Sequence, residues 1–268
     1  MKIEASGTPG KILIDCLDCG AMFPVEDFRE GSFAGMAAEM YERSRYCPEC
    51  EEKRKSEESR RIREARRAEL AARLPELLER SGVEYFYCHD RATGELFTEP
   101  PCRAAAEWLY RHRRENVLLS GATGTGKSTS ACFVAMGLIA EERKVRYVNL
   151  RKLLAEWRAA KTSDAPFAAE KMLRGLFALD LCIIDEVVGK ARISESGQEL
   201  LFELLESVNS GACRSRIWLL GNFYTGSIEA IFADPEPVRR RLQENFVCAC
   251  ITAQGEIKTI QVYGGKKR

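Results

Sequence analysis

One glycine-rich run carries the clearest chemical signal in this sequence. Residues 121–128 read GATGTGKS, after the apolar run 117–119 and before a helix-like run at 129–140. Glycines let the backbone wrap around phosphate groups with its N–H groups pointing inward, and Lys127 can reach the β- and γ-phosphates of a nucleotide. Ser128, at the positive end of the helix, is suited to bind Mg²⁺. The run therefore predicts a nucleoside triphosphate site, with a chance glycine-rich turn as the alternative.

Two carboxylates end a second apolar run. Residues 181–186 read LCIIDE, which predicts a strand that brings Asp185 and Glu186 to the carboxyl edge of a parallel sheet, beside the phosphate loop. Asp185 would hold Mg²⁺ through water, and Glu186 would polarise the water that attacks the γ-phosphate. A surface carboxylate pair at a strand end is the alternative. The residues that we assign to binding of ATP and Mg²⁺ are Gly121, Thr123, Gly124, Thr125, Gly126, Lys127, Ser128, Thr129 and Asp185.

Further polar groups follow the next apolar run. Gly221 and Asn222 come directly after residues 217–220, so Asn222 can hold the attacking water or sense the γ-phosphate, unless the pair is only a turn. Three arginines at 239–241 lie on a predicted short helix. One of them could enter a neighbouring subunit's site as an arginine finger. A solvated basic face is the alternative.

Four cysteines near the N-terminus form two close pairs. Cys16 and Cys19 make one Cys-x-x-Cys turn, and Cys47 and Cys50 make the other. Each turn can present two sulfurs to one tetrahedral metal, so the spacing predicts a structural Zn²⁺ site, with a redox-active pair as the alternative. The separation of the pairs requires an inserted loop or helix, which we place at 33–46. The other cysteines are expected in the core: Cys88, Cys102, Cys132, Cys182, Cys213, Cys248 and Cys250.

A parallel sheet would bring the nucleotide-binding groups to one edge. Apolar runs predict strands at 116–119, 144–150, 181–184, 217–220 and 246–252, with 257–263 as a hairpin partner of the last. Helix-length amphipathic runs alternate with them. The clearest one extends from Ser194 to Ser210 and is followed by Gly211 as a stop signal. This alternation is typical of an α/β fold with helices covering a parallel sheet.

Composition divides the chain into three regions. Residues 1–50 hold the paired cysteines, residues 51–82 are mostly Glu, Arg, Lys and Ala, and residues 83–268 hold the sheet pattern. Opposite charges three or four positions apart support an exposed helix in the middle region, which Pro75 should break or kink. We expect a zinc-binding module, a charged helical linker and one ATPase domain.

The overall composition excludes several classes of protein. The 268 residues are 45% hydrophobic, which allows a real core and excludes wholesale disorder. The 41 basic and 40 acidic side chains give a net charge of +1, so a contact with nucleic acid would need a local basic patch. No apolar run approaches the roughly 18 residues of a membrane span, and no secretion signal is evident. We expect a soluble, cytoplasmic protein.

The motifs and their order resemble the AAA+ ATPases of the replicative helicase-loader family, the DnaC/IstB-like group of bacteria and phages. Residues 147–154 (YVNLRKLL) and 199–205 (ELLFELL) are also similar to that family's sequences. The resemblance covers about 83–263 and implies that Asn222 is the first sensor and that Arg241, just before a leucine, is the finger. The sequence departs from the pattern in having Glu186 where many loaders have a second aspartate and Pro237 where some relatives have arginine.

The resemblance implies a loader that places a replicative DNA helicase on single-stranded DNA during DNA replication. ATP bound between subunits of a ring or spiral would act as an assembly switch, and hydrolysis would release the complex. The N-terminal module would grip the hexameric helicase. A transposition helper ATPase of the IstB type and a zinc-anchored adaptor with a structural nucleotide are the alternatives.

Overall fold

The computed structural model describes residues 2–27, 29, 36–187, 194–222 and 235–260. The chain divides into two compact units, an N-terminal unit, Met1–Leu70, and a C-terminal unit, Ala71–Arg268. Their boundary falls inside the charged segment that we predicted at 51–82. Each unit is described by itself below.

The N-terminal unit contains a small antiparallel sheet. Strands β1 (Ile3–Ala5), β2 (Lys11–Asp15) and β3 (Met22–Glu26) pair in that order, and the helix α1 (Ala37–Arg43) covers part of the predicted helical insertion at 33–46. Residues 33–35 lie outside the described residues. The buried residues of this unit include alternate side chains of β2 and β3 and three of the paired cysteines: Ile12, Ile14, Cys16, Phe23, Val25, Tyr41, Cys47 and Cys50.

The charged segment forms one long helix, α2 (Pro48–Arg80). Of the break or kink that we expected at Pro75, the break is wrong, because the helix continues through this residue to Arg80. Proline removes one backbone donor and its ring crowds the carbonyl group four residues earlier, and the leucines around it compensate by packing. Leu78 is buried in the core of the C-terminal unit, and Leu74 and Leu77 pack against that core. Tertiary packing therefore outweighs the local penalty of the proline.

Helix α2 ends in a Schellman motif. Val83 donates its N–H to the carbonyl of Leu78 at 3.0 Å, and Gly82 donates to the carbonyl of Glu79 at 2.9 Å. Gly82 has φ +76°, the left-handed conformation that the motif requires. The side chains of Val83 and Leu78 are both buried in the same core, as is usual for this motif. The end of α2 is thus tied to the C-terminal unit.

A six-stranded sheet forms the centre of the C-terminal unit. Its order is β5-β6-β7-β4-β8-β9, in which the first five strands are parallel and β9 pairs antiparallel with β8. The strands are β4 (Asn116–Gly121), β5 (Val145–Asn149), β6 (Leu181–Asp185), β7 (Arg216–Gly221), β8 (Phe246–Ile251) and β9 (Ile257–Thr259). The predicted parallel α/β fold is confirmed, and the end of the predicted hairpin strand, from residue 261, lies outside the described residues.

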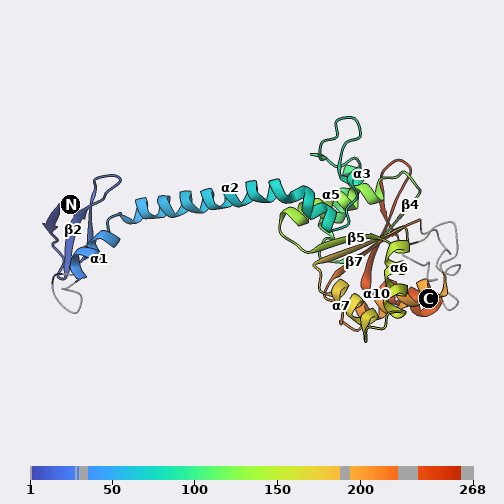
Figure 1. The fold of residues 1–268 in the computed structure, drawn as a ribbon. Coiled ribbons are helices and arrows are strands. Elements are labelled where there is room, and N and C mark those ends of the chain that lie inside the picture. The colour runs from blue at the N-terminus through green and yellow to red at the C-terminus, as the bar shows by residue number, and fades with distance from the viewer. Residues whose placement is uncertain (1, 28, 30–35, 188–193, 223–234, 261–268) are drawn as a thin grey trace, which may run out of the picture. The chain divides into compact units, whose positions relative to one another are not determined.

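Helices cover both faces of this sheet (Figure 1). They are α3 (Tyr85–Cys88), α4 (Arg103–Arg111), α5 (Lys127–Ala140), α6 (Leu150–Lys161), α7 (Ala168–Phe177), α8 (Glu195–Asn209) and α10 (Pro235–Asn245). Alternate residues of β4 enter opposite cores: Val117 and Leu119 lie with residues of α4 and α5, and Leu118 lies with residues of α6, α7 and α8. Burial on both faces explains why the strands read as continuous apolar runs.

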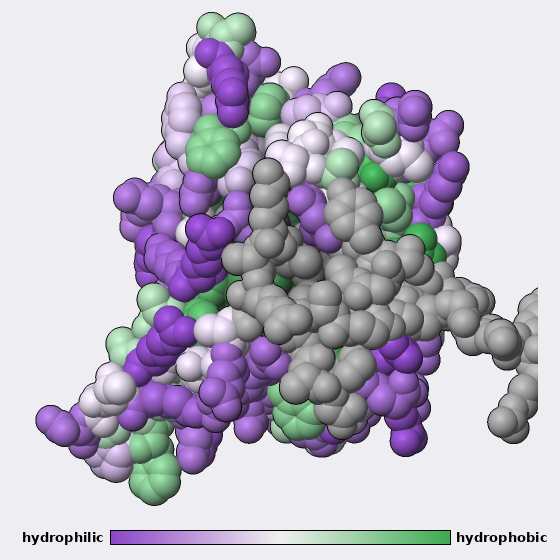
Figure 2. Space-filling model, turned by 90° about the vertical axis from the view of Figure 1, so that its right-hand side faces the viewer, coloured by the Kyte–Doolittle hydropathy of each residue, from purple (hydrophilic) through white to green (hydrophobic). Residues whose placement is uncertain are grey.

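On the face shown in Figure 2, the described surface is mostly hydrophilic, with scattered hydrophobic residues, as is common for protein surfaces. Among the helices that the structure describes, none combines the length and the apolarity needed to cross a bilayer.

Candidate nucleotide site and metal centre

The phosphate loop connects β4 to α5, as its sequence predicts. At Gly126 φ is +88°, and a Cβ there would lie 3.0 Å from the Cβ of Cys102. At Gly121 a Cβ would lie 2.8 Å from the carbonyl oxygen of Ile251 on the neighbouring strand. Both positions therefore need glycine, since a side chain would meet neighbouring atoms and strain the backbone.

Lys127 lies in the first turn of α5 and is buried. Its Nζ donates to the carbonyl oxygens of Gly121 and Ala122, both at 2.8 Å. Burial lowers the pKa of its ammonium group, and the charge of Asp185 partly opposes this effect. An ammonium held by two loop carbonyls is within reach of phosphate oxygens that would bind in the same loop.

Asp185 is the last residue of strand β6, and Glu186 follows it in a different environment. Asp185 is buried, and its Oδ2 accepts a 2.6 Å hydrogen bond from the hydroxyl of Tyr147 while its Oδ1 accepts one of 2.6 Å from the N–H of Glu186. Glu186 is exposed and has φ +55°, an uncommon value for a residue with a side chain. Its Oε2 accepts a hydrogen bond from Asn149. Asn149 also caps α6, because its Oδ1 accepts from the N–H of Arg151 at 2.8 Å.

A pocket of about 410 Å³ brings the predicted groups together. Asn222 donates to the hydroxyl of Thr123 across this pocket at 3.3 Å. Thr125 and Gly121 do not line it; Thr125 donates to the carbonyl of Ala122 at 2.9 Å within the loop. The predicted site residues that line the pocket are Thr123, Gly124, Gly126, Lys127, Ser128, Thr129, Asp185, Glu186 and Asn222, and Gly221, directly before Asn222, lines it as well.

Two lining residues were missed in the sequence. Tyr87 and Arg91 come from the segment after α2, far from the phosphate loop in the chain. The ring of Tyr87 packs edge-on against that of Tyr147, with 5.7 Å between centroids. Burial raises the pKa of Tyr87, and hydrogen bonds with the side chains of Tyr147 and Ser128 lower it in part. The aromatic run at 85–87 was the only signal in the sequence, and it does not indicate what the rings face.

The oxygen atoms in this pocket fit Mg²⁺ in kind. The hydroxyl of Ser128 and the carboxylates of Asp185 and Glu186 are hard ligands, which Mg²⁺ prefers together with water and phosphate oxygens. Lys127 lines the same pocket as these acids, and its positive charge would attract the phosphates of a nucleotide.

The three arginines of α10 differ in their surroundings. Arg241 forms an ion pair with Glu206 of α8, and its guanidinium lies 4.5 Å from the centroid of the Phe202 ring. Arg240 is mostly exposed and pairs with Glu244 at 2.8 Å, and Arg239 pairs with Glu236 at 2.9 Å. Arg241, the residue that the resemblance favours as the finger, therefore makes contacts inside its own chain.

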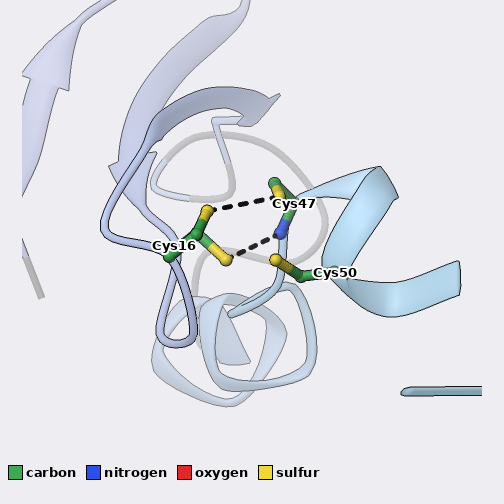
Figure 3. A group of neighbouring side chains, drawn as sticks. Cys16, Cys47 and Cys50 are labelled. Carbon is green, nitrogen blue, oxygen red and sulfur yellow. Dashed lines mark hydrogen bonds between the residues drawn. The ribbon is translucent and has the colours of Figure 1, made fainter. Parts of the chain in front are cut away.

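The four N-terminal cysteines form one cluster. The sulfurs of Cys16, Cys19, Cys47 and Cys50 all lie within 4.8 Å of one another, and Figure 3 shows those of Cys16, Cys47 and Cys50 close together. The backbone N–H of Cys47 donates to the sulfur of Cys16 at 3.3 Å. This hydrogen bond is the main reason that the pKa of the Cys16 thiol falls to about 6.

The geometry of the cluster fits zinc. Tetrahedral Zn²⁺ with bonds of about 2.3 Å to sulfur places neighbouring sulfurs about 3.8 Å apart. The sulfurs of Cys19 and Cys47 lie 3.8 Å apart. An N–H donor to a ligating sulfur, like that of Cys47, is the kind of outer contact that orients ligands in such sites.

Comparison with known proteins gives a family match over most of the chain. The model of the family described as IstB-like ATP binding protein matches residues 53–236. An ATP-binding protein of insertion sequence IS1162 from Pseudomonas fluorescens is 28% identical over 117 residues, which make up 44% of this chain and 49% of that protein. The match therefore spans about half the length of that curated relative.

The solved structures that match have low sequence identity and TM-scores below 0.5. DnaI is 14% identical, with 62% of this chain and 89% of that chain covered and a TM-score of 0.44. The DnaC helicase loader is 15% identical, with 54% of this chain and 85% of that chain covered and a TM-score of 0.40. DnaA from Aquifex aeolicus with bound AMPPCP is 17% identical, with 58% of this chain and 48% of that chain covered and a TM-score of 0.41.

Proposed function

Because this chain belongs to the family of IstB-like ATP binding proteins, we propose that it binds ATP with Mg²⁺ in the pocket between α5 and the ends of β6 and β7 and hydrolyses it. The observation that carries the proposal is the meeting of Lys127, Ser128, Asp185, Glu186 and Asn222 around one pocket of about 410 Å³. These groups are the ones that phosphoryl transfer to water requires.

Each group has a part in this mechanism. Lys127 would leave the loop carbonyls for the β- and γ-phosphates, and Ser128 and Asp185 would hold Mg²⁺, which neutralises charge on the phosphates. Glu186 would accept a proton from the attacking water once its carboxylate is free of Asn149, and Asn222 would orient that water. An arginine of α10 from a neighbouring copy would stabilise the transition state.

We propose that the protein loads a replicative DNA helicase onto single-stranded DNA, as a ring or spiral of copies, with the cysteine cluster holding Zn²⁺ in the part that grips the helicase. The cluster of four cysteines and the long charged helix α2 support this proposal. A transposition helper is the second candidate, which the similarity to an insertion-sequence protein supports.

Two substitutions test the ATPase assignment. Lys127→Ala should abolish tight ATP binding, because its ammonium is the cation that would bind the phosphates. Glu186→Gln should retain ATP but stop hydrolysis, because Glu186 handles only water. Nucleotide affinity and phosphate release are measured on both variants. Normal turnover by Glu186→Gln would refute the assignment, and absence of turnover in the parent protein would favour the adaptor with a structural nucleotide.

A second experiment identifies the protein partner: this chain is used to capture proteins from a host extract with and without ATP. Retention of a hexameric helicase that depends on ATP supports the loader. Retention of a transposase instead supports the transposition helper and contradicts the loader.

A further inference from the structure

We propose that Tyr147 is a positioning residue for Asp185, whose carboxylate its hydroxyl holds in the orientation that binds Mg²⁺ with ATP. The proposal rests on the ATPase function above and adds to it a residue whose type and place in the sequence give no sign of a role in metal binding.

The contact itself is short and buried. The Tyr147 hydroxyl lies 2.6 Å from Oδ2 of Asp185, and both residues are nearly inaccessible to solvent. Oδ1 of the same carboxylate accepts from the N–H of Glu186, also at 2.6 Å. Each oxygen of a carboxylate can accept two hydrogen bonds. Within the described residues, one position on each oxygen is thus used to fix the group, which leaves the other for the metal or its water.

Strand register explains how Tyr147 reaches Asp185. On the parallel strands β5 and β6, Tyr147 lies opposite Ile183 and Asn149 lies opposite Asp185. The tyrosine side chain is long enough to extend along the strand by two residues, so that its hydroxyl reaches the carboxylate. Tyr147 and Asn149 of the edge strand therefore contact the two acids separately: Tyr147 binds Asp185, and Asn149 binds Glu186.

The backbone and ring of Tyr147 are also held in place. Its N–H donates to the carbonyl of Ser81 at 2.7 Å, just after helix α2. Gly82 packs against its carbonyl oxygen so closely that a Cβ would lie 2.3 Å away. On the other side, the ring of Tyr87, which lines the nucleotide pocket, packs edge-on against the Tyr147 ring. A hydroxyl fixed this way can orient a carboxylate without rearranging.

The test separates metal binding from packing. Tyr147→Phe keeps the ring and removes the hydroxyl, and Tyr85→Phe is the matched control, because it removes a tyrosine hydroxyl that donates to the carbonyl of Gly94 at 3.0 Å, outside the nucleotide pocket. Binding of a fluorescent ATP analogue is measured in EDTA and at increasing Mg²⁺. Thermal melts of each variant accompany the titrations.

We expect the affinity of Tyr147→Phe for the analogue in EDTA to lie within about twofold of that of the parent. The variant should need about 10–100 times more Mg²⁺ to reach half of the metal-dependent gain in affinity, because a metal ligand that loses its outer hydrogen-bond partner usually loses affinity for the metal by this factor. Tyr85→Phe should need as much Mg²⁺ as the parent. An unchanged Mg²⁺ requirement in Tyr147→Phe overturns the proposal. An equal loss of affinity in EDTA and in Mg²⁺ also overturns it, because that result indicates general damage to the pocket.

A second variant covers the case in which Tyr147→Phe does not fold. Gly82→Ala keeps the hydroxyl but places a Cβ 2.3 Å from the carbonyl oxygen of Tyr147, so that the two segments must move apart. This variant should raise the Mg²⁺ requirement, and no rise overturns the proposal. A parent protein that binds no analogue in either condition overturns the proposed ATPase function and this inference with it. Metal-dependent binding by the parent together with an unaltered variant overturns only the inference.

Discussion

Gly82 offers a quantitative test of how the end of α2 is packed, because Gly211 provides a matched comparison. Both glycines follow a helix, and their φ values are +76° and +74°. A Cβ on Gly211 would meet nothing within 4 Å, whereas a Cβ on Gly82 would lie 2.3 Å from the carbonyl oxygen of Tyr147. Alanine at the two sites therefore adds the same backbone strain but a very different contact.

The expected magnitudes follow from these two contributions. A left-handed backbone costs alanine about 1–2 kcal/mol relative to the right-handed form, and the stiffer unfolded chain returns about 0.4–1 kcal/mol. Gly211→Ala should therefore destabilise the protein by about 1 kcal/mol. Displacing a packed backbone carbonyl adds about 1–3 kcal/mol, so Gly82→Ala should cost about 2 kcal/mol more than Gly211→Ala.

Tryptophan fluorescence is a suitable readout of thermal unfolding. All three tryptophans, Trp108, Trp157 and Trp218, are buried in the C-terminal unit. For a unit of this size, about 2 kcal/mol corresponds to a Tm about 4–8 °C lower. We expect that difference between the two alanine variants at equal protein concentration. Equal losses of Tm would refute the argument, because they would mean that the carbonyl moves aside without cost.

The remaining predictions concern the metal centre and the arginines. The purified protein should hold about one Zn²⁺ per chain. A chelator should unfold the N-terminal unit without changing the thermal unfolding measured by tryptophan fluorescence, since a core this small needs metal to fold. Metal analysis that finds no zinc, or unfolding of both units together, would contradict this prediction. Arg241→Ala should bind ATP nearly as well as the parent but hydrolyse it about 10³–10⁵ times more slowly, and it should also lower the Tm, because Arg241 contacts Glu206 and Phe202. Arg240→Ala, at an exposed site, should leave the Tm unchanged, and a loss of hydrolysis there alone would transfer the finger role to Arg240.

The sequence was informative where the signal is local. The ends of the five parallel strands lie within about two residues of the predicted ones, because buried parallel strands read as apolar runs that stop at polar residues. Strand β9 ends at Thr259, before the predicted end at residue 263. The phosphate loop follows the same reasoning, since glycines at fixed positions determine its backbone. The break at Pro75 was wrong because the leucines on either side of it pack on a core formed by residues far along the chain.

The contacts between distant segments could not be predicted in this way. Tyr147 reaches Asp185 only because strands β5 and β6 pair in one particular register. Tyr87 lines the nucleotide pocket because the segment after α2 folds back to the phosphate loop. The packing of Arg241 against α8 is of the same kind. The chemical roles of the pocket residues and of the four paired cysteines remain predictions.

The burial of the cysteines divides them by their sensitivity to oxidation. A thiol reacts with oxidants as its thiolate, and burial raises the pKa of Cys182 and Cys248 to about 12, which keeps both protonated. Cys19 is exposed, and its sulfur lies 3.8 Å from that of Cys47. In a metal-free chain, oxidation could join this pair with little movement, and the disulfide would take two ligands away from the metal. Bound zinc would therefore protect the N-terminal unit from oxidative loss of its site, while the buried thiols of Cys182 and Cys248 need no such protection.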